Sequence, residues 1–161
     1  MKIKEAKTGV KKTVEITKIR EADLKRLTKS RYYFDWSGTS KEAEVYTLSI
    51  LDDEDILGAI AILKFPSEFR YEIKLLASSK ENVGEGKIYE GIAGCLIAFT
   101  CRACLNEYGE LSCVSLVPKT KLKPHYIRKY GMQDAGWQIF LEALSLLNII
   151  NRYYNENEEE K

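Results

Sequence analysis

The chain has 161 residues and a formal net charge of +1, from 25 basic and 24 acidic side chains. Hydrophobic residues make up 45% and charged residues 30%, which excludes a wholly disordered chain and allows a buried core. So balanced a charge does not favour a dedicated binder of nucleic acid or of membrane surfaces, because such binders gain their affinity from excess Lys and Arg.

The length suits a single domain over residues 1–161. We expect residues 1–11 to be a basic N-terminal segment and residues 155–161 to be an acidic tail, both solvated. No apolar run follows the basic start, and the most apolar stretch, 91–105, is shorter than the roughly 20 residues that a bilayer span needs. The sequence therefore predicts a cytoplasmic protein with no membrane partner.

Apolar alternation and turn residues predict mostly strands in the first half of the chain. We expect a strand at 13–16, a short helix at 21–27, a loop over 29–41, and strands at 44–50, 56–63 and 71–77. The last three strands have short links, one of them an acidic turn at 52–55. This spacing predicts an antiparallel meander.

Helices and strands alternate in the second half. After a polar loop at 78–89 we expect helices at 91–108, 121–130 and 142–154, and strands at 111–117 and 137–141. Gly109 and Gly131 each follow a predicted helix, as C-terminal glycines commonly do. The whole pattern predicts an α+β fold: a central mixed, mostly antiparallel sheet with helices on both faces, in which the 91–108 helix joins two parallel neighbours.

The segment Gly91-Ile92-Ala93-Gly94 opens the longest predicted helix. Small residues at a helix start let backbone N–H groups approach an anion closely, and the helix dipole favours negative charge there. A phosphate or pyrophosphate is therefore the ligand that this segment suits. Glycine at a helix start also serves tight packing, so the segment alone leaves both alternatives open.

The same segment carries a resemblance to a known family. Ile88-Tyr89-Glu90-Gly91-Ile92-Ala93, followed by Leu96, is similar to motif A of the GNAT superfamily of N-acetyltransferases, which reads Q/R-x-x-G-x-G/A at the head of a long helix. Thr120 and Tyr130-Gly131-Met132 resemble the family's motif B. Small bacterial members look similar in finer detail, in Asn82-x-Gly84 and in Lys119-Thr120-Lys121-Leu122 before His125-Tyr126. The order of elements from 13 to 141 resembles the same fold.

Motif A departs from the family pattern at one position. Ile88 stands where the family has Gln or a basic residue, with Lys87 one place earlier. A competing register places the phosphate loop at 81–86, where Gly84 and Gly86 lie closer to the preceding strand. We prefer the Gly91 register, because it gives the helix its expected length.

The resemblance implies acetyl-CoA as the cofactor. Its pantetheine arm would pair like an added strand beside residues 75–77, and its pyrophosphate would lie at the glycine loop. The cofactor-binding residues that the resemblance implies are Leu76, Ala77, Ser78, Asn82, Gly84, Lys87, Gly91, Ile92, Ala93, Gly94, Thr120 and His125. For His125, a surface position with no such role is an equal alternative.

The activity that the resemblance implies is acetyl transfer to a primary amine, by direct attack of the amine on the thioester. An amine with a pKa of roughly 10.4 must first lose a proton. Glu72 is the candidate base, and its alternative is an ordinary carboxylate paired with Arg70 or Lys74. Tyr126 is the candidate general acid, with packing as its alternative.

Two further groups of residues have open alternatives. Tyr33, Phe34 and Trp36 lie where the family builds its acceptor pocket and are candidate substrate-binding residues, with core packing as the alternative. Cys101-x-x-Cys104 invites a redox or zinc interpretation, but its spacing lies inside a predicted helix. We therefore expect buried, apolar thiols for all four cysteines and no metal site.

The function that the resemblance implies is an acetyl-CoA-dependent N-acetyltransferase of the GNAT type. One alternative is a non-catalytic module of the same fold that binds acyl-CoA or a protein, and another is a toxin-like acetyltransferase acting on aminoacyl-tRNA. The expected partner is a small-molecule or protein amine. Nucleic acid is not favoured, and a homodimer stays open.

Overall fold

The computed structural model describes residues 1–155, without the side chain of residue 40. The predicted acidic tail from 156 onward lies outside the described residues. The chain divides into two compact units, Met1–Ala61 with Leu75–Leu96, and Ile62–Lys74 with Ile97–Lys161. That residues 1–161 act as one domain stays a prediction.

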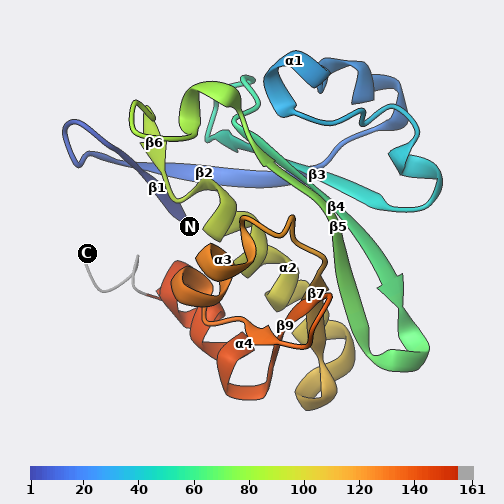
Figure 1. Ribbon diagram of the computed structural model, residues 1–161. Coiled ribbons are helices and arrows are strands. Elements are labelled where there is room, and N and C mark those ends of the chain that lie inside the picture. Colours follow the sequence, from blue (N-terminus) through green and yellow to red (C-terminus); the bar gives the residue numbers. More distant parts are fainter. Residues whose placement is uncertain (156–161) are drawn as a thin grey trace. The chain divides into compact units, whose positions relative to one another are not determined.

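The described residues contain one nine-stranded sheet, and Figure 1 labels its strands except β8. They are β1 (Lys2–Glu5), β2 (Lys11–Lys18), β3 (Glu44–Ile50), β4 (Gly58–Phe65), β5 (Arg70–Ser78), β6 (Tyr89–Glu90), β7 (Cys113–Leu116), β8 (Gln133–Asp134) and β9 (Ile139–Glu142). Their order is β6-β1-β2-β3-β4-β5-β7-β9-β8. The predicted meander is present as the neighbours β3, β4 and β5, and the mixed α+β fold with a mostly antiparallel sheet is confirmed.

Four α-helices and several single turns complete the described chain. The α-helices are α1 (Lys29–Tyr32), α2 (Ile92–Tyr108), α3 (Lys123–Tyr130) and α4 (Ala143–Ile150). The 3-10 turns are η1 (Glu21–Arg26), η2 (Thr39–Lys41), η3 (Pro66–Glu68), η4 (Lys80–Asn82) and η5 (Gly109–Leu111), and η6 (Asn151–Asn155) is a π-helical turn. None of the helices between residues 1 and 155 combines the length and apolar character that crossing a membrane requires.

The first unit contains a strand that the sequence does not predict. β1 pairs antiparallel with β2, and on its other side with β6, where Lys4 lies opposite Glu90. Ile3 is only 1% exposed. The expectation of a solvated basic segment over residues 1–11 is therefore wrong for β1. A four-residue strand with one apolar side chain gives too short an alternation to be recognised, although Ile3 faces inward between outward lysines.

The second unit contains the parallel pair that the sequence predicts. β5 pairs with β7 in parallel from Arg70–Cys113 to Ile73–Leu116, and β7 pairs antiparallel with β9. The chain passes from β5 to β7 through α2, so the prediction of two parallel neighbours joined by this helix is confirmed.

Several predicted boundaries differ from the structure, and three of these differences have a local cause. The expected loop over 29–41 contains α1 and η2, where the buried ring of Tyr32 supports a single helical turn. The strand expected at 111–117 is shorter, because η5 occupies its start. The helix expected at 142–154 is α-helical only to Ile150, after which η6 changes the hydrogen-bond pattern.

Candidate functional site

The end of strand β5 belongs to the first unit and carries three of the predicted cofactor-binding residues. The pairing of β5 with β7 ends at Ile73, while β5 itself continues to Ser78. Leu76 and Ser78 are half-buried, and Ala77 is buried. A strand that outruns its parallel neighbour leaves main-chain groups on one edge, which is the feature that an added extended segment needs.

A closed loop follows β5 and is held by the side chain of Asn82. Its amide nitrogen donates to Ser79 Oγ at 2.8 Å, and its Oδ1 accepts from the backbone N–H of Tyr89 at 2.8 Å. The backbone N–H of Ile88 also donates to the carbonyl of Glu81, at 3.2 Å. Asn82 is 6% exposed and Ser79 is fully buried. The structure therefore uses the amide of Asn82 to close the loop at its base.

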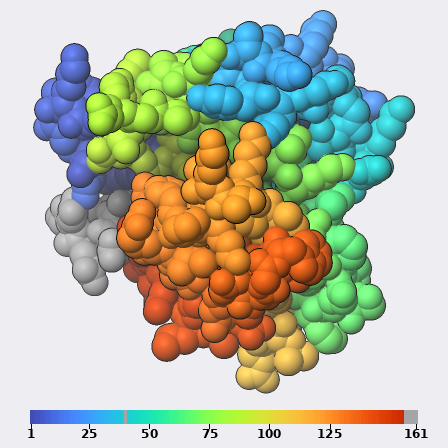
Figure 2. All heavy atoms as spheres, in the orientation of Figure 1, coloured from blue at the N-terminus to red at the C-terminus, as the bar shows by residue number. Residues whose placement is uncertain are grey.

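The tip of this loop is exposed. Gly84 has φ +84° and open space around its Cα, Val83 and Ile88 are about half exposed, and Lys87 is half-buried. Figure 2 shows the yellow-green atoms of this segment at the surface. Gly84 lies nearer β5 in sequence, as the competing register requires, but no helix follows Gly86 directly.

Helix α2 begins directly after Gly91, as the preferred register predicts. Gly91 has φ +98°, a conformation that side chains other than glycine rarely adopt, and its carbonyl accepts the first helical bond from Cys95 at 3.0 Å. The N–H groups of Ile92, Ala93 and Gly94 belong to the first turn and have no acceptor within the helix. These amides form an electropositive end that suits a phosphate.

The first turn of α2 packs onto strands β4 and β5 at Gly58, a glycine that belongs to none of the sequence motifs. A Cβ placed on Gly58 would lie 2.5 Å from Ile92 Cγ2, 3.1 Å from the carbonyl oxygen of Ala77 and 3.2 Å from Leu96 Cδ1. The helix start therefore lies beside the end of β5. A glycine inside a predicted strand was the only sequence signal for this close approach.

Glu72 belongs to the second unit and forms part of a polar cluster with Arg70. Arg70 Nη1 donates to Glu72 Oε1 at 3.1 Å and to Ser115 Oγ at 2.7 Å, while its Nη2 donates to Glu68 Oε2 at 2.7 Å. The Glu72 side chain is 21% exposed. The structure places Arg70, a predicted ion-pair partner of Glu72, in contact with its carboxylate.

Helix α3 carries Tyr126 and His125, also in the second unit. Burial raises the pKa of the Tyr126 hydroxyl, so this phenol keeps its proton at neutral pH. Tyr126 packs against the rings of His125 and Tyr130, with centroids 5.8 Å away in both cases. His125 is exposed, as is Thr120, which precedes the helix. Tyr126 thus combines packing with a protonated hydroxyl.

The aromatic residues after α1 divide between core and surface. Trp36 is 1% exposed, and its Nε1 donates to the carbonyl of Tyr32 at 3.1 Å. Phe34 is half-buried and meets Trp36 edge-on at 6.3 Å. Tyr33 is exposed and has φ +70°, a strained conformation for an aromatic residue. Packing accounts for Trp36, whereas Tyr33 is available for contact with a ligand.

The cysteines are mostly buried thiols, as expected. Cys95, Cys101 and Cys104 are fully buried in α2, and Cys113 is half-buried in β7. Burial raises the pKa of Cys95 to about 12 and that of Cys113 to about 11. Thiols that hold their protons this firmly are poor nucleophiles and poor metal ligands.

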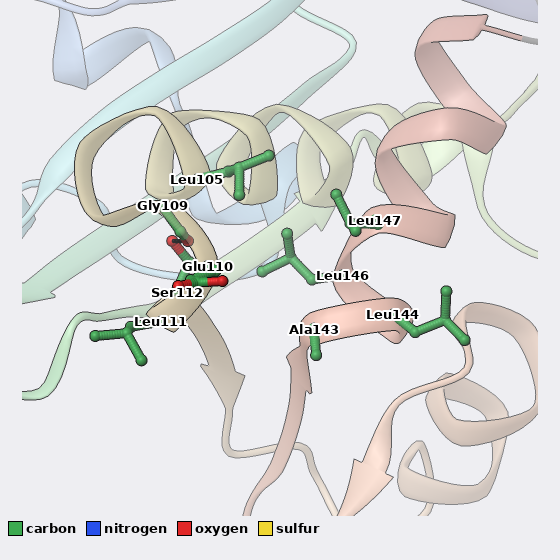
Figure 3. A pocket seen from close by; sticks show the side chains of 9 residues that line it. All are labelled: Leu105, Gly109, Glu110, Leu111, Ser112, Ala143, Leu144, Leu146 and Leu147. Carbon is green, nitrogen blue, oxygen red and sulfur yellow. Dashed lines mark hydrogen bonds between the residues drawn. The ribbon is translucent and has the colours of Figure 1, made fainter.

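The second unit contains a pocket that none of the predicted site residues lines. It has a volume of about 450 Å³ in the second unit, between the end of α2, the turn after it and the start of α4. Figure 3 shows its leucines and one carboxylate, and its lining residues are Leu105, Gly109, Glu110, Leu111, Ser112, Ala143, Leu144, Leu146 and Leu147. Because the lining offers no cationic side chain and one anionic side chain, it does not suit a phosphate ligand.

Sequence comparison finds no matching protein-family model and no matching curated protein, but solved structures do match. The spermidine/spermine N-acetyltransferase SpeG from Vibrio cholerae, in mutant forms, gives a TM-score of 0.60 at 11% identity, over 89% of this chain and 98% of that chain. A Bacillus subtilis acetyltransferase in complex with CoA gives 0.56 at 14% identity, over 83% and 99%.

A GNAT family acetyltransferase from Elizabethkingia anophelis with acetyl-CoA bound gives a TM-score of 0.54 at 16% identity, over 76% of this chain and 78% of that chain. At such low identity these likenesses speak to the fold alone. The chain has the fold of the GNAT acetyltransferases, and the fold that the sequence resemblance implies is confirmed.

Proposed function

We propose that the chain is an N-acetyltransferase that uses acetyl-CoA and acetylates a primary amine by direct attack on the thioester. The observation that carries the proposal is the first turn of α2, where Gly91 at φ +98° presents the amides of the next three residues beside the end of β5. Solved structures of the same fold contain CoA or acetyl-CoA, which supports the choice of cofactor.

The residues at this end of the first unit fit such a cofactor. The amides of Ile92, Ala93 and Gly94 would hold the pyrophosphate. Lys87, which precedes Gly91 closely in the sequence, would add a positive charge. The main chain of Leu76 and Ala77 would pair with the pantetheine arm. When bound, acetyl-CoA supplies an acetyl group activated as a thioester.

Two side chains of the second unit would handle protons. We assign Glu72 as the base that takes a proton from the acceptor ammonium, through its carboxylate oxygens. We assign Tyr126 as the acid that would protonate the thiolate sulfur released when the thioester C–S bond breaks, because its hydroxyl keeps a proton that it can donate.

The proposed acceptor is a primary amine on a small molecule or a protein. Tyr33 and Phe34 offer aromatic rings after α1, and such rings attract an ammonium group. SpeG, which shares the fold, is a spermidine/spermine N-acetyltransferase. A cationic amine is therefore the acceptor class that we propose.

Calorimetry with acetyl-CoA tests the cofactor assignment. An Ala93→Glu variant should lose about tenfold or more in affinity, because its carboxylate would face the cofactor phosphates at the helix start. Asn106→Glu, with the same charge change in the last turn of α2, is the matched control and should bind normally. Absence of heat with the wild type at about 1 mM cofactor would refute the proposal. Binding without release of thiol in the presence of amines would favour a non-catalytic acyl-CoA-binding module instead.

A further inference from the structure

Arg31 connects three segments of the first unit. It lies in α1 and donates to both oxygens of Asp55, from Nη1 at 2.8 Å and from Nη2 at 3.1 Å. It also donates to Glu81, from Nε at 3.1 Å and from Nη2 in a second, shorter contact. One guanidinium thus links α1 to the turn before β4 and to the loop after β5. The geometry uses the planar, forked donors that distinguish Arg from Lys.

Glu81 lies at the point where the loop after β5 closes. Its backbone carbonyl accepts from Ile88, and the next residue, Asn82, accepts from the N–H of Tyr89. Glu81 and Asn82 therefore hold the two ends of the segment 83–87 together. The last bond of this closure is at Tyr89, two residues before Gly91. In Figure 2 the blue atoms of the α1 segment lie beside the yellow-green atoms of this loop.

The rest of α1 is fixed independently of the loop. Tyr32 donates through its hydroxyl to the carbonyl of Ile56 at 2.6 Å, and the N–H of Ser79 donates to the carbonyl of Leu57 at 2.8 Å. Asp55 therefore belongs to a segment, 55–57, that already contacts both α1 and the end of β5. Arg31 is therefore anchored through Asp55 on one side and contacts the loop through Glu81 on the other.

Both side chains of the contact between Arg31 and Glu81 are charged. Hydrogen bonds from Arg31 lower the pKa of Glu81 below its usual range, so this carboxylate is ionised at neutral pH. The side chains of Arg31 and Glu81 are 33% and 35% exposed, which leaves the contact partly shielded from water. A charge-assisted, two-donor contact of this kind is stronger than an ordinary surface ion pair.

We infer that Arg31 is a positioning residue, which holds the 79–91 loop through Glu81 in the conformation that receives the cofactor phosphates. The inference rests on the proposed function and deepens it. It holds for either glycine register, because Gly84 and Gly91 lie on the two sides of the same loop closure. Without Arg31 the loop would have to be ordered on binding, at a cost to affinity.

Hydrogen–deuterium exchange on the free protein provides a readout that needs no cofactor. In Arg31→Lys and Glu81→Gln, the amides of Ile88 and Tyr89 should exchange about tenfold faster than in the wild type, with β3 unchanged. Combining the two substitutions should add little to the exchange rate, because both weaken the same contact between Arg31 and Glu81. Arg20→Lys, at an exposed ion pair with Asp23, is the matched control and should leave the loop unchanged. Unchanged exchange at these two amides, or faster exchange in β3 as well, would overturn the inference.

Calorimetry with acetyl-CoA completes the test. Arg31→Lys and Glu81→Gln should each bind acetyl-CoA about tenfold more weakly than the wild type, whereas Arg20→Lys should bind it as the wild type does. If the wild type and Arg31→Lys bind acetyl-CoA equally well, the positioning role of Arg31 is overturned and the proposed function is not. A wild type that binds no cofactor would refute the proposed function, and the exchange result would still report whether Arg31 holds the loop.

Discussion

At the scale of single residues, Glu72 has two roles to separate. Its Oε1 accepts from Arg70, which also donates to Glu68 and Ser115, so one guanidinium holds three acceptors. In the parallel register Glu72 lies opposite Ser115, on the same face of the sheet. The cluster therefore fixes the direction of the Glu72 carboxylate, which a base needs and which a merely structural ion pair also shows.

Kinetics of a Glu72→Gln variant separate these roles. If Glu72 removes the proton of the acceptor amine, the substitution should lower kcat about a hundredfold or more, because a carboxamide cannot accept that proton. Acetyl-CoA affinity, measured by calorimetry, should stay within about twofold of the wild type. Glu68→Gln removes a more exposed partner of the same Arg70 and should leave kcat nearly unchanged. Equal losses in the two variants would make Glu72 an ordinary member of the ion-pair cluster.

At the scale of elements, the start of α2 depends on a close approach to β4. Gly58 has no side chain, and this allows Ile92 and Leu96 to lie against the strand. Ile92 is β-branched and has one strongly preferred rotamer in a helix, and the carbonyl of Ala77 is backbone, so neither neighbour yields easily. The position of the proposed phosphate site is therefore tied to the packing of this glycine.

A Gly58→Ala variant tests this dependence. The added methyl should overpack the contact and lower the free energy of unfolding by about 1–3 kcal/mol, measured by urea denaturation. Gly38→Ala is the matched control, since a Cβ there meets nothing within 4 Å and φ is −97°, so its stability should change little. A variant as stable as the wild type would show that α2 moves away from β4 without cost.

The elements that the sequence predicts well have strong local signals. α2 and α3 end before Gly109 and Gly131, whose φ values of +65° and +68° require the freedom of glycine, and the strands of the meander have several apolar residues each. The sequence does not predict β1 and α1, because each is only four residues long and its stability comes from partners distant in sequence. Ile3 becomes buried only once β2 and β6 pair around it.

The part of the candidate site that lies in one continuous motif could be predicted from the sequence. The parts that the fold brings together from distant positions could not. Gly91 and the start of α2 follow from a short run of small residues. The contact between Arg31 and Glu81 joins residues 50 positions apart, and Arg31 belongs to no sequence motif. The same holds for Gly58 and Ile92, because a glycine in a strand signals a close approach without identifying the neighbour.

At the scale of the whole molecule, both units bury groups that must stay protonated. In the first unit, burial raises the pKa of Cys95 to about 12, and burial with a hydrogen bond to Glu44 raises that of Tyr46 to about 12. In the second unit, burial raises the pKa of Cys101, and raises that of Cys113 to about 11. The folded chain therefore binds more protons than the unfolded chain in alkaline solution.

This difference predicts a loss of stability at alkaline pH. Unfolded thiols release their protons near pH 8.5, whereas the folded thiols keep theirs to about pH 11 or above. Between these values each buried thiol should lower the free energy of unfolding by about 1.4 kcal/mol per pH unit, and below pH 8 its contribution should be fully present. Urea denaturation from pH 7 to pH 10.5 measures the slope.

A Cys95→Ala variant assigns part of that slope to one thiol. The substitution removes a buried titrating group from α2, so the slope above pH 8.5 should become shallower by about 1.4 kcal/mol per pH unit. Ile97→Val, at another fully buried position of the same helix, should lower stability equally at every pH and leave the slope unchanged. A Cys95→Ala slope equal to that of the wild type would mean that this thiol ionises in the folded protein as readily as in the unfolded chain.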